Sequence, residues 1–371
     1  MSTIAAIELH RLSLPLPVPY KVSNLVFRSF DPIVVAVRDR NGAQGWAETV
    51  VGPGYTDETD EEAWAFCREW AGRLLQQDTE HAKACLARHL ERHSHAASIM
   101  ISAIEMAEGN RYLQRREPAR VPLLVPLQQQ DEDGLGREVE RLLAQGYATF
   151  KVKIGFDVGA DLRRVGWIQQ AVRGRARLRL DANQAYTVEQ ARAFLAELAP
   201  TDIELLEQPC DKHDWAANAR VAADAPVPIM LDESIYTLAD VERAAGLAGV
   251  AFVKVKINKL GGVQRLGDGL LHIGRSGLRP VLGNGVATDI SCWMEAAVAS
   301  HTIDTTGEMN GWLKLPESLL RNPVRVEQGA MCLPAGYWPV VDTRVLESYA
   351  LESLAFAPAS VAAGPVSTGP A

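Results

Sequence analysis

The stretch between residues 149 and 257 repeats one pattern, an apolar strand that ends in charged or amide side chains. The strands are TFKVKIG (149–155), RLRLDAN (177–183), IELLEQP (203–209), PIMLDES (228–234) and AFVKVKI (251–257). They recur about every 25 residues with amphipathic stretches between them, as strand–helix units of a parallel barrel do. The carboxyl ends of such strands open on one face, so we expect their polar side chains to converge there.

Further apolar strands are predicted at 121–127, 279–285 and 302–308, which gives eight strand–helix units in all. This number favours a (β/α) barrel, an α/β fold, over an open doubly wound sheet. The open sheet is disfavoured because no GxGxxG motif follows the first strand.

The first 120 residues have a different texture. Strands are expected at 4–14, 31–40 and 45–50, and a helical pattern follows from 57 to about 114. We therefore predict an α+β capping domain over 1–120, completed by about 323–356. A barrel catalytic domain covers 121–322, and a small-residue, Pro/Gly-rich tail at 357–371 is expected to be disordered.

Composition limits the possible partners and the compartment. A net charge of −8 argues against nucleic acid or an anionic membrane surface as the main partner, because both need a basic surface. The five cysteines are scattered, with no CxxC pair, and no signal peptide or membrane-spanning run is evident. The interpretation is a cytoplasmic protein with no nucleic-acid or membrane partner.

Three strand-end carboxylates, Asp181, Glu207 and Asp232, predict a metal site. Any one of them could be a helix N-cap, but three on successive strands are hard to explain in that way. Oxygen ligands alone suit Mg²⁺, with Mn²⁺ as the alternative, and the strand ends offer no His or Cys for zinc.

Two lysine pairs flank these acids. Residues two apart on a strand share a face, so Lys151 points with Lys153, and Lys254 with Lys256. Adjacent ammonium groups lower each other's pKa, which would allow Lys153 to act as a base while Lys151 holds its charge and binds a carboxylate. Three more strand-end side chains are candidates for substrate binding or for supporting the ligands: Asn183, Asn284 and Glu308.

Together the motifs FKVKIG (150–155), LDANQ (180–184), EQP (207–209), LDES (231–234) and KINKLGG (256–262) resemble the enolase superfamily. The last motif resembles the muconate lactonizing enzyme subgroup of the mandelate racemase/muconate lactonizing enzyme family. This resemblance implies a modified TIM-type (β/α) barrel with an N-terminal α+β capping domain, and a homo-oligomer. It departs from the family at 103–113, where the usual Trp-Asp pair is missing, and at 282–285, where no His–Asp dyad stands.

The resemblance also implies roles for individual residues. Asp181, Glu207 and Asp232 would bind Mg²⁺, Lys153 and Lys256 would be acid/base residues on opposite faces of the substrate, and Glu308 would be an eighth-strand carboxylate. Specificity loops would lie at about 19–29 and 51–56. Candidate pocket walls are Tyr20, Phe27, Tyr55 and Trp312, and Arg28 is a candidate partner for a second acidic group on the substrate.

The reaction expected from these parts is abstraction of the proton next to a small-molecule carboxylate, giving an enolate. Racemisation or epimerisation of an amino-acid derivative or related acid is favoured because a second lysine is available. Cycloisomerisation or dehydration through the same enolate stays open. A metal-independent Schiff-base lysine aldolase is the alternative from another class, and a non-catalytic binding protein is the third.

Overall fold

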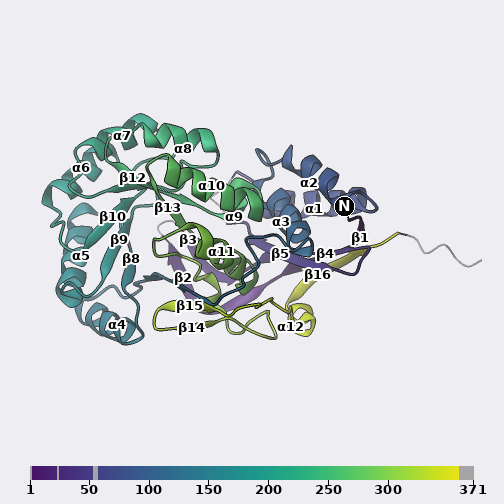
Figure 1. The fold of residues 1–371 in the computed structure, drawn as a ribbon. Coiled ribbons are helices and arrows are strands. Elements are labelled where there is room, and N and C mark those ends of the chain that lie inside the picture. The colour runs from purple at the N-terminus through teal and green to yellow at the C-terminus, as the bar shows by residue number, and fades with distance from the viewer. Residues whose placement is uncertain (1, 23–24, 53–56, 359–371) are drawn as a thin grey trace, which may run out of the picture.

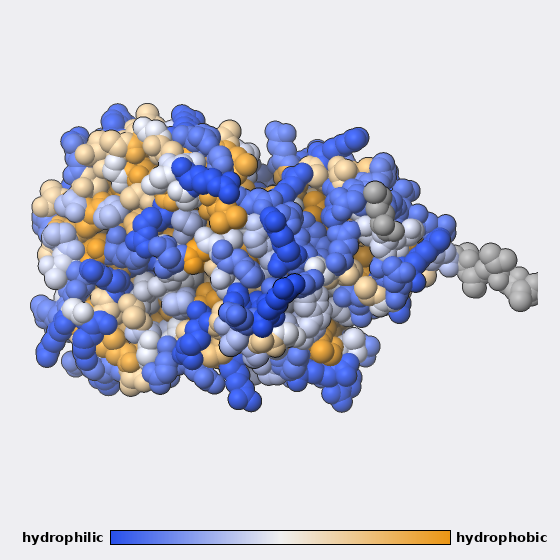
Figure 2. All heavy atoms as spheres, in the orientation of Figure 1, coloured by the Kyte–Doolittle hydropathy of each residue, from blue (hydrophilic) through white to orange (hydrophobic). Residues whose placement is uncertain are grey.

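The computed structural model describes residues 2–22, 25–52 and 57–358. An N-terminal cap and a parallel barrel lie side by side (Figure 1), and one hydrophobic core runs from the cap into the barrel. The face drawn in Figure 2 mixes hydrophobic residues with hydrophilic ones. Within the described ranges, no helix combines the length and the apolar character needed to cross a bilayer.

The cap is an antiparallel sheet with the order β16-β1-β4-β5, covered by helices. Its strands are β1 (Ile4–Leu12), β4 (Pro32–Asp39), β5 (Gln44–Val50) and the C-terminal β16 (Ala350–Phe356). The helices are α1 (Asp60–Leu74), α2 (Thr79–Ala87) and α3 (Ser94–Ala107). A capping box between Thr59 and Glu62 starts α1, whose first turn is rich in acidic residues, within the range expected to be helical.

Much of the loop expected at 19–29 is instead an antiparallel hairpin, β2 (Leu14–Val22) with β3 (Leu25–Phe30). Three prolines in LPLPVPY (14–20) hid the strand pattern, because proline normally argues against a paired strand. A two-stranded ribbon tolerates them, since the free side of β2 needs no amide donors. The hairpin carries Tyr20 and Phe27, and residues 23–24 lie outside the described ranges.

The barrel contains a seven-stranded sheet, in which β7 to β13 follow one another in chain order and the pairings are parallel. Its strands are β7 (Val125–Pro126), β8 (Thr149–Lys153), β9 (Arg177–Asp181), β10 (Ile203–Glu207), β11 (Ile229–Leu231), β12 (Val250–Val255) and β13 (Arg279–Leu282). The helices beside it are α4 (Glu132–Ala144), α5 (Val158–Val172), α6 (Val188–Glu197), α7 (Trp215–Ala223), α8 (Leu238–Ala245), α9 (Ile257–Leu260), α10 (Val263–Arg275) and α11 (Asp289–Thr302).

The prediction of a full eighth strand at 302–308 is wrong. The β-branched residues around Thr302 suggested it, but α11 extends through Thr302, and a short extended segment follows. In that segment Gly307 bridges Leu123 in parallel, and the Glu308 amide donates to the Leu282 carbonyl at 2.9 Å. Residues 307–308 thus join β13 to the segment beside β7 and close the ring in place of an eighth strand.

The C-terminal part of the chain contributes strands to two different sheets. Strands β14 (Arg325–Glu327) and β15 (Ala330–Leu333) pair with β6 (Ala119–Pro122) in a separate three-stranded sheet, and only β16 rejoins the cap. The 3₁₀ turn η1 (Gly311–Lys314) and helix α12 (Thr343–Ser348) complete the elements in the described chain. Residues 359–371 of the expected tail lie outside the described ranges.

Two buried glutamates fasten the cap to the barrel. Glu105 of α3 accepts from the backbone amides of Val263 and Gln264 at the start of α10, at 2.6 and 3.3 Å. Glu48 of β5 accepts from the amides of Thr288 and Ser291 at the start of α11. The first amides of a helix have no acceptor within it, and these carboxyl oxygens accept from them, so the contact between cap and barrel is made without the missing Trp-Asp pair.

Candidate active site

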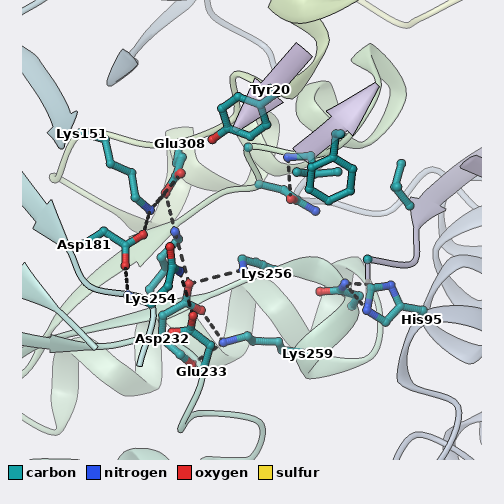
Figure 3. A pocket seen from close by; sticks show the side chains of 18 of the residues that line it. Tyr20, His95, Lys151, Asp181, Asp232, Glu233, Lys254, Lys256, Lys259 and Glu308 are labelled. Carbon is teal, nitrogen blue, oxygen red and sulfur yellow. Dashed lines mark hydrogen bonds and ion pairs between the residues drawn. The ribbon is translucent and has the colours of Figure 1, made fainter. Parts of the chain in front are cut away.

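A pocket opens where the strand ends meet the cap (Figure 3). Of the candidates from the sequence, eleven line it: Tyr20, Phe27, Lys151, Lys153, Asp181, Asn183, Asp232, Lys254, Lys256, Asn284 and Glu308. Strand register brings them together, since Lys153 pairs with Asp181 on β9 and Asp181 with Glu207 on β10. Glu207 is buried and contacts two of the lining lysines. Tyr55 lies outside the described residues.

Lys151 bridges carboxylates from three different strands or segments. Its Nζ lies 2.9 Å from Asp181 Oδ2, 2.9 Å from Glu207 Oε2 and 3.0 Å from Glu308 Oε2. Burial alone would lower the pKa of Lys151, but Asp181, Glu207 and Glu308 together raise it well above its usual value. Lys151 is therefore held as an ammonium ion.

Lys254 occupies a similar place on the other side of Glu207. Its Nζ is 3.1 Å from Glu207 Oε1 and 3.4 Å from Asp232 Oδ2, and it also donates to Glu308. Burial would lower its pKa as well, but these acids raise it. The mutual lowering of pKa expected within the lysine pairs is thus overridden at Lys151 and Lys254, because buried carboxylates are closer partners than the neighbouring ammonium.

Lys153 and Lys256 have separate partners. The Nζ of Lys153 donates to Asp181 Oδ2 at 2.6 Å and to Asn183 Oδ1 at 2.5 Å. The Nζ of Lys256, just past β12, lies 3.4 Å from Asp232 Oδ2. In the closed ring of seven strands and the 307–308 segment, β8 and β12 are four positions apart, so these two side chains enter from opposite sides.

The protonation of the acids follows from their neighbours. Burial would raise the pKa of Asp181, but Lys151, Lys153 and Lys254 lower it to about 2. The same competition lowers the pKa of Asp232 well below its usual value, mainly through Lys256 and Lys259. Glu207 differs, since burial and the nearby charge of Asp181 raise its pKa to about 7.

The donor set suits a hard cation. Asp181, Glu207 and Asp232 are buried and offer oxygen only, the chemistry that Mg²⁺ prefers. In the part of the chain that the structure describes, however, no three acidic, His or Cys side chains are gathered tightly enough to form a ready cage. The ammonium groups of Lys151 and Lys254 bridge these carboxylates instead.

Several lining residues were missed by the sequence reasoning. Lys259 donates to the carbonyl and, at 2.6 Å, to Oδ1 of Asp232, and its position three residues after Lys256 in KINKLGG was the available signal. Glu233 follows Asp232 just past the end of β11 at Leu231, and no role was predicted for it. Its Oε1 accepts from Asn183 Nδ2 at 2.9 Å. His95, from the cap, carried no sequence signal.

Two of the suggested residues do not line the pocket: Arg28, the candidate partner for a second acidic group, and the candidate wall residue Trp312. Arg28 is exposed and lines an adjoining surface hollow with Arg11 and Asp31, and Trp312, within η1, packs against the core. Phe27 does line the pocket. Adjacent residues on β3 point to opposite faces, which explains the difference between Phe27 and Arg28.

Comparisons with known proteins agree with this architecture. Residues 134–337 match the family model described as "Enolase C-terminal domain-like". The chain is 28% identical over 281 residues to the L-Ala-D/L-Glu epimerase of Bacillus subtilis, covering 70% of this chain and 75% of that protein. It is 26% identical over 357 residues to muconate cycloisomerase 1 of Rhodococcus opacus, covering 90% and 94%.

A solved structure matches in the same way. The muconate lactonizing enzyme from Pseudomonas fluorescens, complexed with muconolactone, superposes with a TM-score of 0.85 at 25% identity, over 94% of this chain and 99% of that one. The family model covers more than half of the chain, and the relatives share both the cap and the barrel. The chain therefore belongs to the enolase superfamily, in the mandelate racemase/muconate lactonizing enzyme subgroup, and is an enzyme of enolate chemistry.

Proposed function

We propose that this enzyme racemises or epimerises a small carboxylate, such as an amino-acid derivative or related acid, by moving its α-proton between two lysines. The observation that carries the proposal is the placement of Lys153 and Lys256 on opposite sides of one pocket, each against a different aspartate. A base on each face allows the proton to leave from one side and return on the other.

Enolase-superfamily enzymes generally use a divalent metal ion. Here Asp181, Glu207 and Asp232 are the residues proposed to hold Mg²⁺, with Mn²⁺ as the alternative. When bound, the ion would supply positive charge for the substrate carboxylate and for the charge that develops on it.

The protein groups divide the remaining work. Lys151 keeps its proton and is proposed to bind a carboxylate oxygen and stabilise the enolate. Its ammonium is desolvated, so its electrostatic interaction with the developing negative charge is stronger than it would be in water. Lys254 and Glu308 form a buried pair that holds Glu207 and Lys151 in place. Asn183 orients Lys153, and Asn284 with Tyr20 is proposed to face the rest of the substrate.

Cycloisomerisation is the second candidate, because the muconate cycloisomerase match covers 90% of the chain. It would pass through the same enolate, which forms when a group adds to the β-carbon or which loses a group from that carbon. The Schiff-base aldolase is not supported, because the family is now established, and Lys151 and Lys254 are held protonated rather than nucleophilic. We further propose a cytoplasmic homo-oligomer; the five free cysteines suit a reducing compartment.

The test is hydrogen exchange in D₂O. Carboxylates from several classes are incubated with enzyme and Mg²⁺, and deuterium at the α-carbon is followed by NMR. Exchange together with inversion of the stereocentre is expected for at least one substrate class. A ring-closed product would favour cycloisomerisation and a dehydrated product would favour dehydration. No exchange with hydroxy acids, amino-acid derivatives or lactones would refute the enolate proposal.

A further inference from the structure

The two sides of the pocket differ in charge. All of the described lysines that line it come from the barrel side: Lys151, Lys153, Lys254, Lys256 and Lys259. The described cap residues that line it are Tyr20, Phe27, Val50, Gly52 and His95. The cap side therefore contributes aromatic, aliphatic and imidazole groups to the described lining.

His95 adds no charge to this wall. Burial lowers its pKa to about 3, with a further contribution from Lys256, so the ring is neutral at ordinary pH. Its Nδ1 lies 2.6 Å from Thr49 Oγ1, and Asn258 Nδ2 lies 3.0 Å from the ring nitrogens. His95 therefore belongs to a neutral hydrogen-bonded group of cap and barrel side chains.

The hairpin presents its apolar face to the pocket. Tyr20 and Phe27 stack with ring centroids 6.5 Å apart, and Phe27 meets Phe30 edge to face at 5.8 Å. These rings form a cluster with Leu16 and Val50, against which Val286 packs from the barrel. Arg28, the next residue after Phe27, is expected on the opposite face of β3 and does not line the pocket; it lines an adjoining hollow, which Phe27 and Val50 also line.

A nearby ammonium, that of Lys314, is already engaged behind the wall. Its Nζ donates to the Gly285 carbonyl at 3.0 Å and to Asn310 Oδ1 at 2.9 Å, and it sits 4.5 Å from the centre of the Tyr20 ring. Through these contacts with two barrel oxygens and with the face of the Tyr20 ring, the Lys314 ammonium holds η1 against Tyr20. A remote acid placed on the hairpin side would have to displace these contacts to reach Lys314.

We propose that the site takes a carboxylate whose remaining substituent is uncharged, and that it discriminates against substrates with a second, remote carboxylate. This inference rests on the proposed function. The reacting carboxylate has the barrel lysines as partners, whereas a second carboxylate would be desolvated against Tyr20, Phe27 and Val50. An unpaired charge is strongly disfavoured in such surroundings, so the discrimination is expected to be at least tenfold.

The experiment compares matched pairs in the D₂O exchange assay. Each scaffold in the library is measured beside a counterpart that carries a terminal carboxylate, with asparagine against aspartate and glutamine against glutamate derivatives as isosteric pairs. For every scaffold that exchanges, kcat/KM for the uncharged member should exceed that of its acidic counterpart at least tenfold. Equal or faster exchange of the acidic members would overturn the substrate inference while leaving the proton-transfer proposal intact. No exchange with any pair would instead overturn the proposed function.

Two variants locate the cause. Phe27→Arg places a guanidinium on the wall and should shift the ratio of kcat/KM toward the acidic member at least tenfold. Arg28→Ala is the neighbouring control and should leave both members unchanged. If Arg28→Ala selectively reduces exchange of an acidic substrate, Arg28 binds the second carboxylate and the inference is wrong. If Phe27→Arg does not fold, the parent enzyme and Arg28→Ala still decide the question.

Discussion

The carboxyl group of Glu48 is the best place to test how the cap is held on the barrel. It is 1% exposed, and its Oε1 accepts from the amides of Thr288 at 2.9 Å and Ser291 at 3.3 Å. Two effects oppose each other: burial favours the neutral acid, and the N-terminus of α11 favours the anion. Burial is the larger of the two and raises the pKa of Glu48 from 4.5 to about 7.

The predicted perturbation is Glu48→Gln, which keeps the accepting oxygen and stays neutral at every pH. Because the pKa is raised in the folded state, the stability contributed by the protonated acid is complete below pH 4.5. It is lost as the pH rises through about 7. A shift of about 2.5 units corresponds to about 3 kcal/mol. The variant should therefore match the parent at pH 4.5 and exceed it by about 3 kcal/mol at pH 8.

Thermal unfolding at the two pH values measures this difference. A chain of 371 residues has an unfolding entropy of about 0.8 kcal/mol/K, so the variant should melt about 4 °C higher than the parent at pH 8. Glu197→Gln, on the exposed end of α6, is the control and should change the melting temperature little at either pH. A Glu48→Gln variant that melts below the parent at pH 8 would show that the ionised carboxylate stabilises α11 and would refute the reasoning.

Two further predictions concern packing and metal binding. A Cβ at Gly45 would lie 2.0 Å from the Ala103 carbonyl oxygen on α3, so Gly45→Ala should destabilise the cap by at least about 3 kcal/mol in urea unfolding. Gly166→Ala, in α5 with nothing within 4 Å, should be neutral or stabilising by up to about 1 kcal/mol, and equal effects of the two variants would contradict the packing argument. Asp232→Asn should weaken Mn²⁺ binding, measured by calorimetry, at least tenfold while the fold is retained. Unchanged Mn²⁺ affinity would show that Asp232 is not a metal ligand. In the parent enzyme, EDTA should stop α-hydrogen exchange until Mg²⁺ is restored.

The barrel strands were predictable because each is a short apolar run that ends in polar residues, and the register follows from parallel pairing. Asp181 and Glu207, for example, could be placed side by side from the sequence pattern alone, and they are direct register partners. The closure of the ring could not be predicted in this way. Thr302 has strand propensity, but it ends the mostly buried helix α11, and tertiary packing outweighs the local preference.

The pocket was predictable on its barrel side and much less so on its cap side. Lysines two apart on a strand must share a face, so the two pairs followed from spacing. The cap side depends on the β2–β3 hairpin and on His95, which reach the pocket only through long-range packing. The pKa of Lys151 was also beyond sequence reasoning, because it depends on Glu308 approaching within 3.0 Å from a distant segment.

The central claim is that Lys153 and Lys256 act on opposite faces of one substrate carbon. Its most direct test is α-hydrogen exchange in D₂O for each enantiomer separately, with Lys153→Ala and Lys256→Ala, and with Lys83→Ala on α2 as a control away from the pocket. Each site variant should lose exchange of one enantiomer by about 10² to 10⁴-fold and retain the other, with the preference reversed between the two variants. If both variants lose both enantiomers equally, the two-base account is contradicted.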